Sequence, residues 1–499
     1  MGIRSLLSKP LAAYIHQQDE KWKNRPAAYQ QKTFQQLIQQ ASRTAFGKDH
    51  GFRDIKSYAD FRKQVPIRDY EQLRPYVDRV VAGEADILWK GKPAYFAKTS
   101  GTTSGTKYIP ITQASIPNHI NSARNALLAY IHETGNSVFL DKKMIFLSGS
   151  PELTTQGGIH TGRLSGIVNH HVPSYLRGNQ LPSYETNCIE DWENKLEHII
   201  NETITQPMSL ISGIPPWVQM YFDRIQERTG QAIKEVFPDF SLFVYGGVNF
   251  EPYRNKLYET IGKKIDSIET YPASEGFIAY QDSQTEEGLL ILLNSGIFFE
   301  FVPADEYFNE NPTRLSIEEV ELNKNYAVII NSNAGLWGYS IGDTVKFISK
   351  KPYRLLVTGR IKHFISAFGE HVIGEEVEQA MKYAQSQHPE VEITEFSVAP
   401  KVNPSAGLPH HEWLVAFERE PSDMEAFSAT LDKKLCELNA YYDDLIQGGI
   451  LKQLSITPLQ TDAFQQYMKS IGKLGGQNKV PRLANDRKIA DKIQEWKLG

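Results

Sequence analysis

The 499-residue sequence contains only two cysteines, Cys188 and Cys436, which lie far apart and belong to no CxxC pair. Such a chain cannot build a disulfide framework, and it lacks the paired thiolates of a structural zinc site. Few and isolated cysteines are typical of proteins that work in a reducing compartment. We therefore expect a cytoplasmic protein.

Long apolar runs are also missing. The most apolar stretch, residues 289–302, is interrupted by Asn294, Ser295 and Glu300, so it predicts paired strands rather than a membrane span. Near the N-terminus, Leu6 stands where a myristoylation signal needs serine or threonine, and lysine and proline soon interrupt the apolar residues. We expect neither an export signal nor a membrane partner.

Charge of one sign is not concentrated anywhere in the chain. There are 54 lysines and arginines against 59 aspartates and glutamates, a net charge of −5, and no basic block, so we expect no nucleic-acid partner. The 40% hydrophobic and 23% charged residues are ordinary for a soluble globular protein. A length of 499 residues allows two or three domains.

What the sequence does have is a ten-residue segment without apolar side chains, residues 98–107, which reads KTSGTTSGTK. Glycines let a backbone approach a ligand closely, and hydroxyls and a lysine supply donors and positive charge. This combination predicts a polyphosphate-binding loop. Its candidate binding residues are Thr99, Ser100, Gly101, Thr102, Thr103, Gly105 and Lys107.

The spacing of this loop excludes a Walker loop, which needs four residues between its glycines and a Gly-Lys-Ser/Thr run before a helix. Here only three residues separate the glycines, and Thr106 stands before Lys107. The flanks, residues 95–97 and 108–111, predict two short strands, so we expect the loop to form a hairpin tip. An ordinary flexible surface loop remains the alternative.

The rest of the chain predicts an α/β fold. Residues 1–90 are expected to form a helical cap region, and residues 114–133 a helix that Gly135 ends. Apolar runs that alternate with helical patterns predict βαβ units around a parallel sheet. These runs are residues 144–147, 209–211, 242–245 and 265–270.

Ligands of such sheets bind beyond the carboxyl ends of the strands. The turns Ser148–Gly149 and Gly246–Gly247 follow two of the predicted strands there. We assign the first turn to substrate binding and the second to cofactor binding.

Residues 288–358 contain several short apolar strands, which predict an antiparallel sub-barrel that closes a large domain of residues 1–360. Residues 361–499 then alternate helices and strands independently of the parallel sheet. We expect a small, mobile α+β C-terminal domain.

Arg124 lies four residues after Ile120, on the apolar face of the predicted helix at 114–133. An arginine there can hold a substrate carboxylate in a bidentate fork. Alternatively, its stem covers the core while its head reaches water. Both interpretations remain open from the sequence.

Three further motifs are modest signals on their own. Residues 271–276, YPASEG, supply a tyrosine that can stack on adenine, a donor in Ser274, and a carboxylate in Glu275 that can coordinate Mg²⁺. In YSIGD, Asp343 can accept hydrogen bonds from ribose hydroxyls, although Gly-Asp is also common in turns. The TGRIK run that contains Arg360 precedes a Gly-Glu segment at 369–370, which is otherwise typical of a hairpin.

Together with the GQNKVPR run that contains Lys479, these motifs resemble the adenylate-forming, firefly-luciferase-like superfamily. More closely, they resemble the plant auxin-responsive acyl acid–amido synthetases and their bacterial relatives. The five motifs follow one another in the family order from residue 98 to 482 and span most of the chain. The pivot position, usually aspartate in the superfamily, is Lys362 here.

The resemblance implies ATP and Mg²⁺ as cofactors and a small carboxylic acid and an amino acid as substrates. It implies that Tyr271, Ser274, Asp343 and Arg360 bind the nucleotide, that Glu275 binds the metal, and that Lys479 stabilises charge at the α-phosphate. The expected function is activation of the acid as acyl-AMP and transfer to an amine. Transfer to coenzyme A, or nucleotide and acid binding without turnover, are the alternatives.

Overall fold

The computed structural model describes residues 2–100, 106–172, 177–189, 191–247, 250–361, 364–365, 372–402, 404, 407–447, 451–474, 480–484 and 486–498. Its contacts divide the chain into two units. The first unit comprises Met1–Phe250 and Lys256–Val357, and the second comprises Glu251–Asn255 and Thr358–Gly499.

The first unit begins with a helical region, as the sequence predicts. A capping box of Ser57 and Asp60 starts the fourth helix, and one of Asp69 and Gln72 starts the fifth, so side-chain oxygens satisfy the first free backbone N–H groups of each. The helices are α1 (Ile3–Lys23), α2 (Pro26–Ala41), α3 (Ala45–Asp49), α4 (Tyr58–Gln64) and α5 (Tyr70–Val81).

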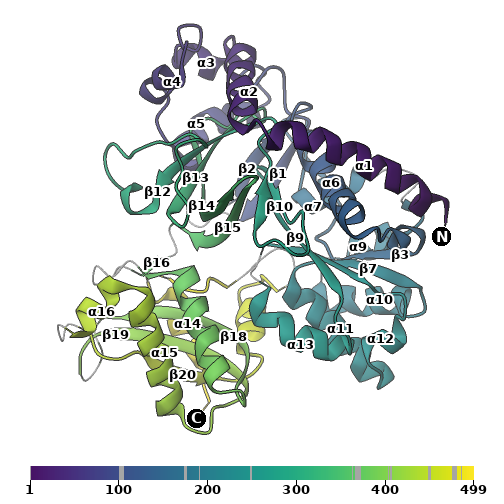
Figure 1. The fold of residues 1–499 in the computed structure, drawn as a ribbon, viewed down its shortest axis with the longest axis vertical. Helices are drawn as coiled ribbons and strands as arrows, with labels where there is room; N and C mark the ends of the chain where they lie inside the picture. The colour runs from purple at the N-terminus through teal and green to yellow at the C-terminus, as the bar shows by residue number, and fades with distance from the viewer. Residues whose placement is uncertain are drawn as a thin grey trace. The chain divides into compact units, whose positions relative to one another are not determined.

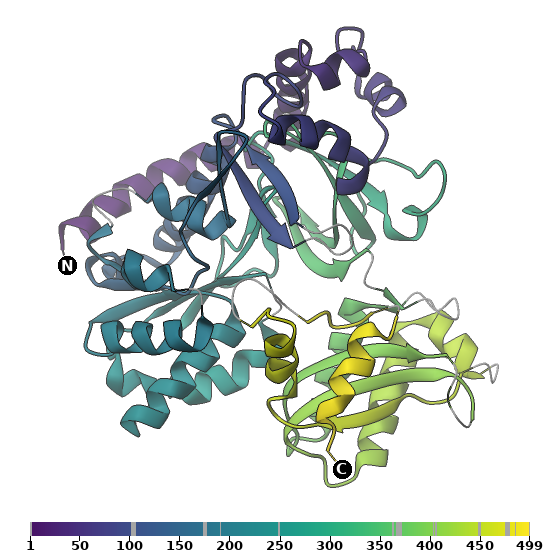
Figure 2. The ribbon, with the colours of Figure 1, turned by 180° about the vertical axis from the view of Figure 1, so that it is seen from behind.

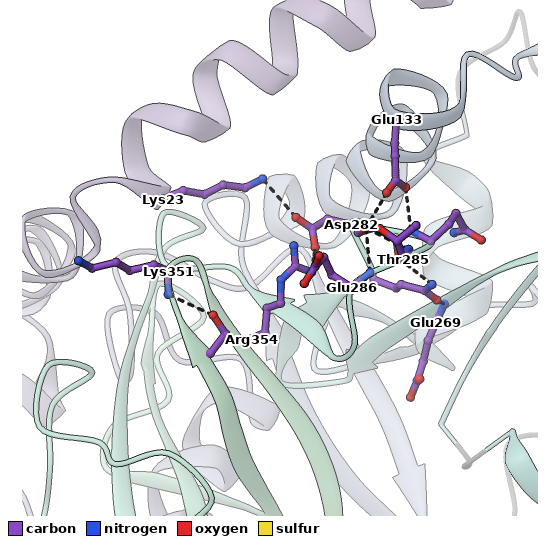
Figure 3. A network of polar contacts seen from close by, with 12 residues as sticks. Lys23, Glu133, Glu269, Asp282, Thr285, Glu286, Lys351 and Arg354 are labelled. Atoms are coloured by element: carbon purple, nitrogen blue, oxygen red, sulfur yellow. Dashed lines mark hydrogen bonds and ion pairs between the residues drawn. The ribbon is translucent and has the colours of Figure 1, made fainter.

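A polar network fastens α1 to the body of the first unit (Figure 3). Lys23 at the end of α1 lies 3.2 Å from Oδ2 of Asp282, and Arg354 pairs with the other oxygen of that carboxylate. Next to it, Glu133 at the end of α6 (Ile116–Thr134) accepts hydrogen bonds from Ser283 Oγ and from the backbone N–H of Gln284. Both helices are thus held by the loop that follows β10 (Gly276–Tyr280).

An eleven-stranded sheet forms the centre of the first unit (Figure 1). Its order is β12-β13-β14-β15-β11-β10-β9-β8-β7-β3-β6. The further strands are β3 (Lys143–Phe146), β6 (Gln180–Leu181), β7 (Met208–Ser212), β8 (Leu242–Gly246), β9 (Asp266–Ala273), β11 (Leu289–Ile291), β12 (Ile297–Pro303), β13 (Asn325–Ser332), β14 (Tyr339–Lys350) and β15 (Tyr353–Arg360).

The strand direction changes in the middle of this sheet. Strands β3, β6, β7, β8 and β9 are parallel, and α11 (Pro215–Thr229) and α13 (Glu251–Ile261) occur in two of their connections, which confirms the predicted βαβ units. At β9 the chain turns back as a hairpin into β10, and the following strands pair antiparallel. The predicted antiparallel strands therefore belong to the same hydrogen-bonded sheet as the parallel strands.

A second, four-stranded sheet has the order β2-β1-β5-β4. Strands β1 (Tyr95–Ser100) and β2 (Thr106–Ile111) pair antiparallel, and β1 also pairs parallel with β5 (Ile159–Gly162). Strand β4 (Thr154–Gln156) pairs antiparallel with the other edge of β5. Figure 2 shows β1 and β2 from behind as a pair of blue arrows. The short helix α7 (Leu164–His170) comes directly after β5.

The first unit has further helices between and beside these strands. Those described are η1 (Val138–Asp141), α9 (Tyr184–Asn187), α10 (Trp192–Thr203), α12 (Ile233–Val236) and η2 (Ala304–Glu306). Helix α6 ends at Gly135, whose φ of 70° caps it in the left-handed region, as predicted from the sequence.

The second unit is a three-stranded sheet between two layers of helices. Along β19 (His410–Arg419), the residues Trp413, Val415 and Phe417 face one core, and the alternate residues Leu414 and Ala416 face the other. Burial on both faces explains why this strand is apolar without alternation. The sheet order is β18 (Glu392–Lys401), β19, β20 (Ser455–Leu459), and the helices are α14 (Gly374–Gln387), α15 (Met424–Leu438), α16 (Ala440–Gln447), α17 (Ala463–Ser470) and α18 (Lys488–Ile493).

Among the helices that the structure describes, none has the length and apolar character needed to cross a membrane.

Candidate active site

The threonine-rich loop lies between two paired strands. Ser100 at the end of β1 pairs with Thr106 at the start of β2, which confirms the predicted hairpin flanks. The predicted ligands Gly101, Thr102, Thr103 and Gly105 lie outside the described residues.

Lys107 stands on β2 opposite Thr99, and its Nζ lies 5.5 Å from the centre of the Tyr70 ring. The hydroxyl of Tyr70 accepts a hydrogen bond of 2.9 Å from the backbone N–H of Tyr108. Tyr70 opens α5, so the capping box of that helix fixes the ring on which the lysine side chain rests. The aromatic face favours the charged amine at this position.

The predicted metal and nucleotide ligands meet at the point where the large sheet changes direction. Ser274 and Glu275 form the turn of the β9–β10 hairpin. The hydroxyl of Tyr271, on β9, donates to Oδ2 of Asp343 at 2.7 Å. The hydroxyl of Tyr339 donates to Oε1 of Glu275 at 3.4 Å.

Tyr339 connects this cluster to the side of the site formed by the β1–β2 hairpin, which carries Lys107. Burial, and then the charge of Glu275, raise the pKa of Tyr339 well above its usual value, and the nearby Tyr70 hydroxyl contributes in the same direction. Arg68, two residues before Tyr70, exchanges backbone hydrogen bonds of 2.8 Å with Gly338 and Ser340. Lys107, Tyr70, Tyr339 and Glu275 therefore belong to one locality of the first unit.

The Gly246–Gly247 turn follows β8 on the same edge. A Cβ atom on Gly246 would lie 2.4 Å from the carbonyl oxygen of Thr270, so only glycine lets β8 approach β9 here. Gly247 has a φ of 81°, which favours glycine again. Neither position of this turn therefore carries a side chain of its own.

The predicted substrate turn Ser148–Gly149 follows β3, further along this edge. Lys195 of α10 donates to the carbonyl oxygen of Ser148 at 3.0 Å and to that of Asn187 at 2.7 Å. Lys195 is only 3% exposed, and burial, followed by the charge of Arg163, lowers its pKa to about 8.

Arg124 is exposed, and its guanidinium donates two hydrogen bonds to the side chain of Asn125. This geometry agrees with the alternative in which the arginine head faces water. Its role as a carboxylate ligand stays a prediction.

A small apolar cavity lies between α6, α7 and the end of β2. Its lining residues are Ile111, Ile116, His119, Ile120, Leu164, Ile167, Val168 and His171. His119 is 4% exposed, and burial lowers its pKa to about 4, so the ring is neutral at pH 7. Its Nδ1 has no hydrogen-bond partner in the part of the chain that the structure describes.

Models of one protein family cover most of the chain. The GH3 family N-terminal domain matches residues 15–181, the central domain residues 290–360, and the C-terminal domain residues 375–488.

The chain belongs to the GH3 family.

Characterised GH3 relatives are distant but align over nearly the full length. The jasmonoyl–L-amino acid synthetase GH3.5 of Oryza sativa is 21% identical over 92% of this chain and 92% of its own length. The indole-3-acetic acid-amido synthetase GH3.3 of Arabidopsis thaliana is 20% identical over 91% of this chain and 88% of its own.

Solved structures show the same fold. A GH3.15 acyl acid amido synthetase has a TM-score of 0.79 at 14% identity and covers 96% of this chain and 95% of its own. A 2-hydroxyisobutyryl-CoA ligase in complex with an acyl-AMP has a TM-score of 0.63 at 12% identity, with 95% and 92% covered. The GH3 chain thus has the fold of adenylate-forming ligases.

Arg360 belongs to the second unit, and Lys479 lies outside the described residues. The chain that follows Lys479 is held along β18, because Val398 donates to the carbonyl of Arg482 at 2.8 Å and accepts from Ala484 at 2.9 Å. Arg482 also lies 3.2 Å from Glu378 of α14.

Sequence reasoning missed three residues beside this site in the GH3 chain. The side chain of Asn118, on α6, bonds to both the N–H and the carbonyl of Phe277, and thereby fixes α6 against the start of β10. His119 and Lys195 are the other two. All three are polar residues at buried positions. A single sequence does not show which of its polar positions are buried.

Proposed function

We propose that this chain is an ATP-dependent acyl acid–amido synthetase, which activates a carboxylic acid as acyl-AMP and transfers the acyl group to an amino acid. The observation that supports the proposal is that Lys107 lies against Tyr70, which is near Tyr339, the hydrogen-bond donor to Glu275, in a fold that adenylate-forming ligases share. The activities printed for the full-length relatives support it.

In the first step, a carboxylate oxygen of the acid attacks the α-phosphorus of ATP, and pyrophosphate leaves. Lys107 supplies positive charge beside the departing phosphates, and Lys479 supplies it at the α-phosphate. Mg²⁺, when bound, would add positive charge between the phosphate oxygens, and Glu275 is the carboxylate that fits it. Fixed charges act strongly here because they need no reorganisation as the reaction proceeds.

In the second step, the amine nitrogen of the acceptor attacks the carbonyl carbon of the acyl-adenylate. AMP leaves with the bonding electrons of the C–O bond, and the nitrogen loses its proton. Orientation of the two reactants supplies much of the rate.

We propose that the apolar body of the acid binds between α6 and α7, where isoleucine, leucine and valine side chains line a cavity of about 10 Å³ that has to widen to admit it. The relatives act on jasmonate and indole-3-acetate according to their names. Both compounds are therefore the first candidates for an acid screen.

Acid-dependent exchange of pyrophosphate into ATP tests the adenylation step. We expect Lys479→Ala to lower the exchange rate by about 10²-fold or more, because it removes a charge that acts on the transition state. Lys473→Ala is the matched control, a lysine of the same segment for which we expect no change. Equal exchange in both variants would remove Lys479 from the mechanism.

A second candidate function uses coenzyme A as the acceptor. It is favoured by the fold shared with the 2-hydroxyisobutyryl-CoA ligase. Incubation of one activated acid with amino acids and with coenzyme A separates the two functions by product mass. Absence of exchange with every acid of a broad panel would instead favour a binding protein without turnover.

A further inference from the structure

The Ser148–Gly149 turn brings two cations together at the carboxyl edge of the large sheet. Lys195 donates a hydrogen bond to the backbone carbonyl oxygen of Ser148. The side chain of Arg163, the residue before α7, occupies the space above Gly149, where a Cβ atom would lie 2.7 Å from Cδ and 3.3 Å from Nη1. Gly149 therefore makes room for the guanidinium.

Lys195 has no counter-ion among the residues that the structure describes. Both of its hydrogen bonds go to neutral carbonyl oxygens, and it is 3% exposed. Buried charges in proteins are normally paired, because removal of an ion from water is costly. A second cation next to it adds to that cost, as the lowered pKa of the Lys195 amine reflects.

Other polar atoms near this turn are also unused. Ser165 Oγ lies 3.5 Å from the same point above Gly149 and is buried, with no hydrogen-bond partner among the residues that the structure describes. Asn187, whose carbonyl accepts from Lys195, is 1% exposed, and neither atom of its side-chain amide has a partner within the described ranges. Buried polar groups without partners are uncommon in native proteins, and here they occur beside the buried Lys195 amine and the exposed Arg163 side chain.

We propose that Lys195 and Arg163 bind the carboxylate of the acceptor amino acid. The inference rests on the proposed function and names the part of the acceptor that is recognised. An arginine fork matches a carboxylate in two parallel hydrogen bonds, and a lysine adds a point charge. The turn lies two strands from β8, roughly 10 Å at the usual strand spacing, so the acceptor shares the edge that carries the nucleotide candidates.

The chemistry selects the acceptor rather than the acid as the source of this carboxylate. The carboxylate of the acid loses its charge when it becomes an acyl-adenylate. The carboxylate of the amino acid stays charged from binding to product. A pair of fixed cations can therefore stabilise only the carboxylate of the amino acid throughout the reaction.

The test compares L-amino acids with their carboxamides, which keep the amine and lose the negative charge. For wild-type protein we expect a large preference in kcat/KM for the amino acid over its carboxamide. In Arg163→Gln we expect this preference to fall at least tenfold, with acid-dependent pyrophosphate exchange unchanged. Gly149→Ala, which displaces the guanidinium and keeps its charge, should lower the preference in the same direction.

Arg224→Gln, an exposed arginine on α11 paired with Glu227, is the control and should keep the full preference. An unchanged preference in both Arg163→Gln and Gly149→Ala would overturn the proposal. So would a raised KM for the acid in the exchange reaction, because it would assign the cations to the acid.

Failure of the proposed function is distinguishable, because it abolishes exchange in the wild type itself. The inference is then tested by thermal unfolding with the same probes. We expect amino acids, and not their carboxamides, to raise the Tm of wild-type protein and to leave that of Arg163→Gln unchanged. Equal shifts for both kinds of probe would overturn the proposal.

Discussion

The polar side chains at the two ends of the candidate site differ in how their hydrogen-bonding atoms are used. On the nucleotide side, Tyr271 bonds to Asp343 and Tyr339 bonds to Glu275. On the substrate side, His119 Nδ1 and both amide atoms of Asn187 are buried without a partner within the described part of the chain.

This contrast indicates that the polar groups of the nucleotide side are hydrogen-bonded to one another before a ligand binds. The nucleotide is the constant reactant of an adenylating ligase, so its groups can be held in place by one another. The acid and the acceptor vary between members of such a family, so in the proposed function the unpartnered atoms would be satisfied by these ligands. Preorganisation is thus concentrated on the nucleotide side.

The largest expected effect comes from breaking the nucleotide side. Glu275→Gln keeps the shape of the side chain and removes its charge, and we expect the exchange rate to fall by about 10²-fold. We also expect the variant to require more Mg²⁺ for half-maximal exchange. Glu259→Gln, an exposed glutamate on α13, is the control, and a Glu275→Gln rate equal to its rate would contradict the assignment.

A smaller effect, on stability, should appear on the substrate side. The pKa of His119 is lowered from 6.5 to about 4 by burial, so below pH 6.5 the unfolded chain takes up a proton that the folded chain excludes. The free energy of unfolding should therefore fall by roughly 2–3 kcal/mol between pH 7 and pH 4.5 through this one group.

Urea unfolding at the two pH values measures this contribution. We expect His119→Leu to lose that part of the pH dependence, because no titrating group remains at the position. His198→Leu, a change at an exposed histidine of α10, should retain it. The same pH dependence in all three proteins would show that His119 does not titrate as its burial implies.

The smallest expected effect concerns a single hydrogen bond on the nucleotide side. Tyr271→Phe removes the donor to Asp343 and leaves the ring. We expect the KM for ATP to rise by about tenfold, as for the loss of one hydrogen bond to a charged group, with little change in kcat. Tyr14→Phe, on the exposed side of α1, should have wild-type kinetics. A large drop in kcat for Tyr271→Phe would move its role to the transition state.

Much of the fold could be predicted from local patterns. Apolar runs and their turn residues located β3, β7, β8 and β9, and Gly135 marked the end of α6. Boundaries are harder to predict in the C-terminal region, where the apolar residues at 451–456 predict a strand. The strand is instead Ser455–Leu459, which contains Pro458. This strand lies at the edge of its sheet, where proline is tolerated, and Leu451 and Leu454 pack into the core instead.

The nucleotide side of the site was also predictable, because its residues come in contiguous motifs. Tyr339 and Asp343 stand four residues apart in one strand, and Tyr271 and Glu275 stand four apart in one hairpin. The substrate side is assembled from single residues on α6, α7 and α10. Their proximity depends on how these helices pack, which no spacing in the sequence encodes.

Helix α7 has only seven residues, yet it contributes to both surfaces that we propose for recognition of the acid and the acceptor. Ile167 and Val168 line the apolar cavity, while Arg163 and Ser165 at its beginning lie over Gly149. A shift of this short rigid piece moves both surfaces together. During divergence of the family, a substitution that reorients α7 would therefore alter the choice of acyl donor and the choice of amine in a single mutational step.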